Sequence, residues 1–224
     1  SDENTAIGRS AMHQLTTGAK NTSVGYRSGH DMTTGTSNVC IGAEAGTAMT
    51  TTTGNIAIGQ DALKVQTTAN YNTAVGYRAG IAVTSAIGVV LMGYDAGKGI
   101  TTGDTNICIG GFSMDGGAGK TAYGCTHIGH AGQRTGTSGN FNDSMGIDAF
   151  KNPTTGNSNV CLGSGSGNVI TTGSSNSLVG RTAGVAITTG SLNSCVGIVA
   201  GSAITTGAKN VCLGYDAGTS GSPN

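Results

Sequence analysis

A glycine that recurs every 17 residues is the feature that most constrains the fold of this chain. A single step of 19 residues, from Gly110 to Gly129, interrupts the series. A fixed period of this length is the signature of a repeat architecture, in which each unit buries its apolar surface against its neighbours. The thirteen glycines in phase are Gly8, Gly25, Gly42, Gly59, Gly76, Gly93, Gly110, Gly129, Gly146, Gly163, Gly180, Gly197 and Gly214.

The residues around this glycine define a unit with a strand, a turn and a return. Counted from the residue four places before the glycine, positions 1 to 17 read Asn-x-x-aliphatic-Gly-x-x-Ala-Gly-x-x-aliphatic-Thr-Thr-Gly-x-x. Positions 1 to 5 are β-rich and alternate, which predicts a short strand that the glycine at position 5 ends. Thr-Thr-Gly predicts the return turn. Three glycines in each unit exclude a helix of this length.

Four positions predict how the units stack. Position 4 is aliphatic or Met in every copy, so we expect it to point inward, as we do the usually apolar position 12. Position 8 is nearly always Ala or Ser, which predicts two closely approaching walls. Asn occupies position 1 in all units except those with Val89 and Cys125, which predicts a ladder of amide side chains. We therefore predict an all-β parallel solenoid over residues 1–224, with thirteen coils, a length of about 60 Å and an irregular 19-residue coil at 106–124.

Five of the six cysteines stand at position 3 and suggest an oligomer interface. Position 3 alternates with position 4, so we expect it to face away from the coil interior. A surface that is small, apolar and outward-facing is typical of contacts between subunits. The predicted interface residues are Ser23, Cys40, Ala57, Ala74, Leu91, Cys108, Cys161, Leu178, Cys195 and Cys212. Cys195 and Cys212 would lie on adjacent coils, where a disulfide is conceivable, although Cys as a substitute for Ala is the simpler interpretation.

Composition and charge exclude several classes of function. The formal net charge is zero, and only 10% of the residues are charged, without a basic cluster that could follow a nucleic acid. No apolar run approaches the roughly 18 residues that cross a bilayer. Carboxylates are scattered, and no nucleophile–base arrangement repeats or clusters. We therefore expect neither an enzyme nor a cofactor, and neither nucleic-acid binding nor membrane insertion.

Two short motifs have alternative interpretations as ligand sites. Cys125, His127 and His130 have a spacing compatible with zinc, but no second pair of ligands lies nearby in the sequence. A sharper hypothesis is that three copies of His127 meet on a threefold axis and bind an ion. The stretch 115–121 is similar to a phosphate-binding loop, yet Met114 stands where that loop needs glycine. We interpret this stretch as the bulge of the irregular coil.

Two further patterns leave binding functions open. Position 6 carries a tyrosine beside Arg or Asp in four units, namely Tyr26, Tyr77, Tyr94 and Tyr215. These side chains could bind a sugar, or could cover the glycine below them. Thr-Thr pairs recur in nine units, and regular threonine arrays bind ice in some solenoids. Adjacent threonines before glycine are, however, more typical of a turn whose hydroxyls cap backbone groups.

The units 72–80, Asn-Thr-Ala-Val-Gly-Tyr-Arg-Ala-Gly, and 210–218, Asn-Val-Cys-Leu-Gly-Tyr-Asp-Ala-Gly, resemble repeats of bacteriophage tail-fibre proteins. Their Asn-x-x-aliphatic-Gly-x-x-Ala core is similar to the head of trimeric autotransporter adhesins. The resemblance covers essentially the whole chain. It implies a left-handed parallel β-roll with three chains around one axis, although the adhesin unit is shorter and this chain has neither a chaperone domain nor coiled-coil heptads.

These observations lead to an expected function. The leading hypothesis is a segment of a trimeric tail fibre or spike, on a virion or otherwise extracellular, that acts as a structural rod and contacts a host surface glycan or protein. The alternatives are a bacterial surface adhesin or a head-to-tail extracellular filament, and an ice-binding protein that uses the threonine ladder.

Overall fold

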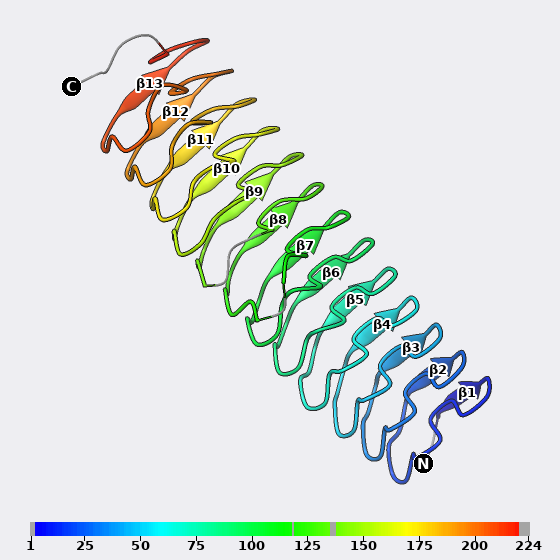
Figure 1. Ribbon diagram of the computed structural model, residues 1–224. Helices are drawn as coiled ribbons and strands as arrows, with labels where there is room; N and C mark the ends of the chain where they lie inside the picture. The colour runs from blue at the N-terminus through cyan, green and yellow to red at the C-terminus, as the bar shows by residue number, and fades with distance from the viewer. Residues whose placement is uncertain (1–2, 118, 135–137, 220–224) are drawn as a thin grey trace. The chain divides into compact units, whose positions relative to one another are not determined.

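The computed structural model describes residues 3–117, 119–134 and 138–219, and within these ranges the protein is all-β (Figure 1). Each strand has three residues, at positions 2 to 4 of its unit. The strands are β1 (Thr5–Ile7), β2 (Thr22–Val24), β3 (Val39–Ile41), β4 (Ile56–Ile58), β5 (Thr73–Val75), β6 (Val90–Met92), β7 (Ile107–Ile109), β8 (Thr126–Ile128), β9 (Asp143–Met145), β10 (Val160–Leu162), β11 (Ser177–Val179), β12 (Ser194–Val196) and β13 (Val211–Leu213). The prediction of a parallel β-solenoid is confirmed.

The chain divides into two compact units, Ser1–Thr121 with β1 to β7 and Ala122–Asn224 with β8 to β13. Within each, every strand pairs in parallel with the strand 17 residues further along the chain. Thr22 thus lies opposite Val39, and Cys195 lies opposite Cys212. The division falls inside the predicted irregular stretch 106–124. The left-handed coiling and the trimeric state implied by the resemblance stay predictions.

The inward and outward faces of the strands are opposite to those predicted. Position 3 is buried from Ser23 to Cys212, whereas position 4 is half-buried or exposed in every unit. The inward prediction for position 4 is therefore wrong, and so is the outward prediction for position 3. The physical reason is the period of 2 in a strand, which puts position 3 on the same side as the asparagine at position 1. The asparagines lie inside, so position 3 follows them.

The interior of each coil is thin and its volume is shared among positions 3, 8, 9 and 12. Position 8 is small and buried, as at Ala45 and Ala79, and the apolar residues at position 12, such as Met49 and Ile187, are buried too. Close approach of two walls and an inward position 12 are both confirmed. Five units have a larger residue in place of glycine at position 9, and all five are buried. These residues are Met12, Leu63, Met114, Gln133 and Phe150.

The asparagines form the predicted ladder inside each stack. The Nδ2 of Asn176 donates to Oδ1 of Asn159 across 2.9 Å, and the backbone N–H of Asn176 donates to the same oxygen across 3.1 Å. Nδ2 also donates to the carbonyl oxygen of Gly190 across 2.9 Å, which ties the strand to the return turn of its own coil. The ladder therefore satisfies buried backbone groups as well as linking one coil to the next.

The glycine at position 5 is required for two separate reasons. Its φ lies in a region that side chains rarely adopt, for example +133° at Gly25. A Cβ at Gly25 would also lie 2.6 Å from the carbonyl oxygen of Gly42 on the next coil. An unusual backbone angle and a close approach of successive coils thus both require glycine at this position.

Candidate interaction surfaces

The outer face of the parallel sheet is a row of aliphatic side chains from position 4. In the second compact unit, Leu162 pairs with Val179, Val179 with Val196, and Val196 with Leu213, so the row is continuous from strand to strand. Leu162 is 36% exposed and Val196 is 41% exposed. A continuous row of such side chains is an exposed apolar patch of the kind that marks interaction sites.

Position 2 and position 6 widen this face. Val160 and Ile107 at position 2 are half-buried, and Ile147 and Ile198 at position 6 are exposed. Position 2 is Val or Ile in six units, Thr or Ser in six and Asp in one, so the aliphatic row at position 4 has a mixed border. The sequence signal for this surface is position 4, which is aliphatic or Met in every copy and lies outside instead of inside.

The position-3 residues do not form a surface at all. The predicted interface residues are buried within their own coils, nine of them with no exposed surface and Cys212 with 6%. They are therefore not available for contacts with another chain, and this prediction is corrected. An alternating strand presents only one of two neighbouring positions to the outside, and here it presents position 4.

The buried cysteine thiols have low reactivity. Cys40 and Cys161 lie in the interior, where burial raises the pKa of both thiols, that of Cys40 to about 12. Cys195 and Cys212 lie opposite each other on β12 and β13 as free thiols. Burial, together with the Cys212 thiol, raises the pKa of Cys195 to about 12. At neutral pH Cys40, Cys161 and Cys195 are therefore thiols, not the thiolates that bind metals or attack disulfides.

His127 also points into the coil, which contradicts an ion shared by three chains. Its side chain has no exposed surface, and Nδ1 forms a hydrogen bond with Oγ of Ser144 on the next coil. Burial lowers the pKa of His127 to about 4, so the ring is neutral at neutral pH. Among the described residues, no group of three or more His, Cys, Asp or Glu side chains is placed to hold a metal ion.

The irregular coil carries a buried lysine. Lys120 is 1% exposed. Its carbonyl oxygen accepts a hydrogen bond from the Thr101 hydroxyl across 3.2 Å, as the carbonyl oxygen of the threonine at position 13 does in other units. Burial lowers the pKa of Lys120 to about 8, and the nearby Asp115 opposes this effect. A lysine that points inward does not form a phosphate-binding loop. One residue of the predicted motif, Ala118, lies outside the described residues.

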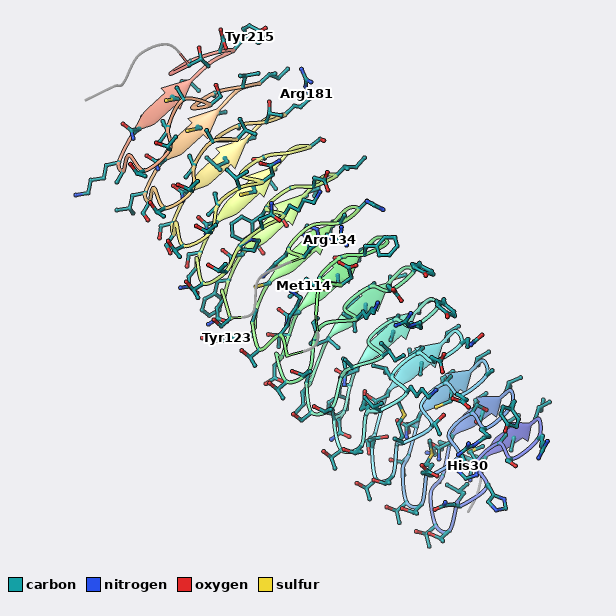
Figure 2. The ribbon with its side chains drawn as sticks, in the orientation of Figure 1. His30, Met114, Tyr123, Arg134, Arg181 and Tyr215 are labelled. Carbon is teal, nitrogen blue, oxygen red and sulfur yellow. The ribbon has the colours of Figure 1, made fainter. Side chains whose placement is uncertain are left out.

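Aromatic and charged side chains line the corner that follows the strands. The rings of Tyr77 and Tyr94 are stacked with centroids 5.3 Å apart, and the guanidinium of Arg78 lies 5.9 Å from the centre of the Tyr77 ring. Figure 2 shows Tyr215 and Arg181 projecting from this outer edge in the second compact unit. Stacked tyrosines with a neighbouring arginine are compatible with the sugar contacts considered from the sequence.

The two threonines of each pair have different surroundings. The first threonine donates its hydroxyl to the backbone of the next coil, as Thr171 does to the carbonyl oxygen of Thr188 across 3.2 Å. The second threonine is exposed in all nine pairs, for example Thr172 and Thr189. The prediction of a turn with capping hydroxyls is confirmed for the first member, while the second forms an exposed column.

Comparisons with protein-family models, with curated proteins and with solved structures give no match for this chain. The described residues hold no helix that is both long and apolar enough to span a membrane. The surfaces above are therefore the basis for a functional proposal.

Proposed function

We propose that the chain is a structural segment of a homotrimeric extracellular fibre, such as a phage tail fibre or spike. The observation that supports this proposal is the continuous aliphatic row at position 4, on the outer face of the sheet. In the single chain these side chains are only partly buried, because a third or more of the surface of residues such as Leu162 and Val179 remains in water. Association with copies of the same row buries this surface, and about 25 cal/mol is gained for each Å² of apolar area removed from water.

The surrounding coil suits a spacer and not a catalyst. Its backbone is hydrogen-bonded from coil to coil around the perimeter, for example from Gly29 N–H to the carbonyl oxygen of Ala45 across 2.9 Å. The most regular polar feature of the interior is the Asn ladder, which links one coil to the next. Tyrosine and arginine side chains on the outer corner are the groups that we propose to contact a host glycan or protein.

The experiment is the mass of the chain in solution, measured by light scattering after size exclusion. We expect three chains for the wild type and one chain for the double variant Val179→Lys/Val196→Lys, because charges on the row oppose burial. Thr172→Lys/Thr189→Lys is the matched control, with the same charges on another face, and should remain a trimer. A monomeric wild type contradicts the proposal, and an open ladder of masses favours the head-to-tail filament.

A second candidate function is ice binding, which the exposed column of second threonines favours. These threonines recur in register in nine units, and their side chains lie on a turn whose preceding threonine donates to the next coil. Here the same variants separate the two functions. Thr172→Lys/Thr189→Lys should abolish thermal hysteresis if the column binds ice, whereas Val179→Lys/Val196→Lys should leave it intact. Absence of thermal hysteresis in the wild type would contradict the ice-binding function.

A further inference from the structure

Two histidines lie next to each other on the outside of the first two coils. His13 and His30 both occupy position 10, one repeat apart, and their rings are stacked with centroids 5.3 Å apart and planes at 24°. His13 is exposed and His30 is half-buried; Figure 2 labels His30. The pair is thus accessible from solvent and separate from the aliphatic row of position 4.

A carboxylate fixes the orientation of one of these rings. Nδ1 of His30 lies 2.6 Å from Oδ1 of Asp31, and the side-chain amide of Gln14 donates to the same oxygen across 3.2 Å. With Nδ1–H donating to the carboxylate, Nε2 carries the lone pair. A histidine held by a carboxylate through its other nitrogen is the usual arrangement around a protein-bound metal ion.

Backbone hydrogen bonds hold the two histidines side by side on neighbouring coils. The N–H of Gln14 donates to the carbonyl oxygen of His30 across 3.1 Å, and the N–H of Asp31 donates to that of Thr47 across 3.0 Å. These bonds link the first coil to the second and the second to the third. The stacking of the coils therefore brings the two histidines together without any adjustment of the main chain.

The separation of the rings fits a shared ion. Zinc–nitrogen bonds are about 2.0–2.1 Å long, and the centre of an imidazole lies about 1.2 Å beyond its nitrogen, so two imidazoles on one tetrahedral ion have centroids about 5.2 Å apart. The observed separation is 5.3 Å. His13 is exposed, so rotation about its side-chain bonds would direct its lone pair toward Nε2 of His30, whose ring Asp31 holds.

We propose that His13 and His30 bind a divalent transition-metal ion, with Asp31 as a positioning residue and water at the remaining coordination sites. Imidazole nitrogen is a ligand for zinc, copper and nickel. The ion links two successive coils on the outside of the stack. This site does not depend on the proposed fibre function, since its ligands come from one chain.

The test is a calorimetric titration of the full chain with Zn²⁺. We expect one ion per chain in the wild type and in the control His130→Ala, which removes an exposed histidine from another coil. His13→Ala and His30→Ala should each weaken binding at least tenfold. Circular dichroism without metal checks that these surface substitutions leave the fold unchanged.

Asp31 is tested separately as a positioning residue. Asp31→Asn should weaken zinc binding by about 10- to 100-fold, and Asp31→Glu, which restores a carboxylate, should recover part of the affinity. Unchanged thermal unfolding of the metal-free Asp31→Asn variant separates this effect from a purely structural one. The proposal is overturned if the wild type binds no Zn²⁺. It is also overturned if the affinity for Zn²⁺ survives both histidine substitutions, because the ion must then have other ligands.

Discussion

The imidazole of His127 occupies the space that a Cβ on Gly132 would fill. These residues stand at positions 3 and 8 of the same unit and face each other across its interior. In most other units both positions carry small side chains, such as Ala57 and Ala62, which are fully buried. The large residue at position 3 is thus accommodated by the loss of a methyl group at position 8, because a packed interior has a fixed volume.

This relationship predicts a strong coupling between two substitutions. Gly132→Ala alone should destabilise the chain by about 1–3 kcal/mol, because the added methyl group overlaps a buried ring. In the His127→Ala background the same substitution should be neutral or stabilising, since it fills the space that the ring has left. Urea unfolding of the four variants of this double-mutant cycle measures the coupling. Equal effects of Gly132→Ala in both backgrounds would contradict the packing described here.

His127 also predicts how stability depends on pH. The pKa of this residue is about 4 in the folded chain and about 6.5 when unfolded. As the pH falls from about 6.5 to about 4, the unfolded chain gains a proton that the folded chain does not, so stability decreases by about 3 kcal/mol and then levels off. Urea midpoints across this range should show the decrease in the wild type and a smaller one in His127→Ser. The same pH slope in both proteins would refute the assignment.

The period, the strand positions and the asparagine ladder could all be predicted from the sequence. Each depends on a residue type that repeats in register, and stacking turns such a repeat into a column. Glycine at position 5, as at Gly25, and asparagine at position 1, as at Asn176, have few roles other than those that the structure shows. The two-residue insertion of the irregular coil was also visible as the longer step between Gly110 and Gly129.

The direction in which the strands face was predicted wrongly, although the sequence held the signal. Positions 3 and 4 are both mostly apolar, and the prediction placed position 4 in the interior because its side chains are larger and more constant. Asn38 and Cys40 share one side of a strand, and a ladder of amides needs shielding from water, so Cys40 had to be inside. Ile41 is left outside for the same reason. The pairing of His13 with His30 depends on the fold of the turns, which the repeat pattern does not specify.

The asparagine ladder predicts a large effect of a single buried amide. Asn176→Leu removes the acceptor of the Asn193 N–H and the donor to the Gly190 carbonyl oxygen. We expect a loss of about 3 kcal/mol in the free energy of unfolding, because both backbone groups stay buried without these partners. The neighbouring exposed residue provides a control, and Ser177→Ala should change stability by less than about 0.5 kcal/mol. If both variants unfold at the same urea concentration, the ladder contributes nothing.

The buried thiols predict slow modification. Cys40 and Cys161 have no exposed surface, and burial raises the pKa of both. Neither should react with a maleimide at pH 7 while the chain is folded, and both should react within minutes in denaturant, as read by mass spectrometry of tryptic peptides. Rapid labelling of either cysteine in the folded chain would show that these coils open.

The glycines at position 5 predict a difference between two substitutions with the same backbone strain. Gly25 and Gly214 have φ values of +133° and +116°, but a Cβ meets the carbonyl oxygen of Gly42 at 2.6 Å in the first case and no atom within 4 Å in the second. Gly214→Ala should therefore cost about 1–3 kcal/mol through its dihedral angle alone. Gly25→Ala should cost clearly more, because the contact is with backbone and can be relieved only if two coils separate. Thermal unfolding of both variants measures the difference. Equal losses would mean that glycine is needed here for its dihedral angle and not for the close approach of successive coils.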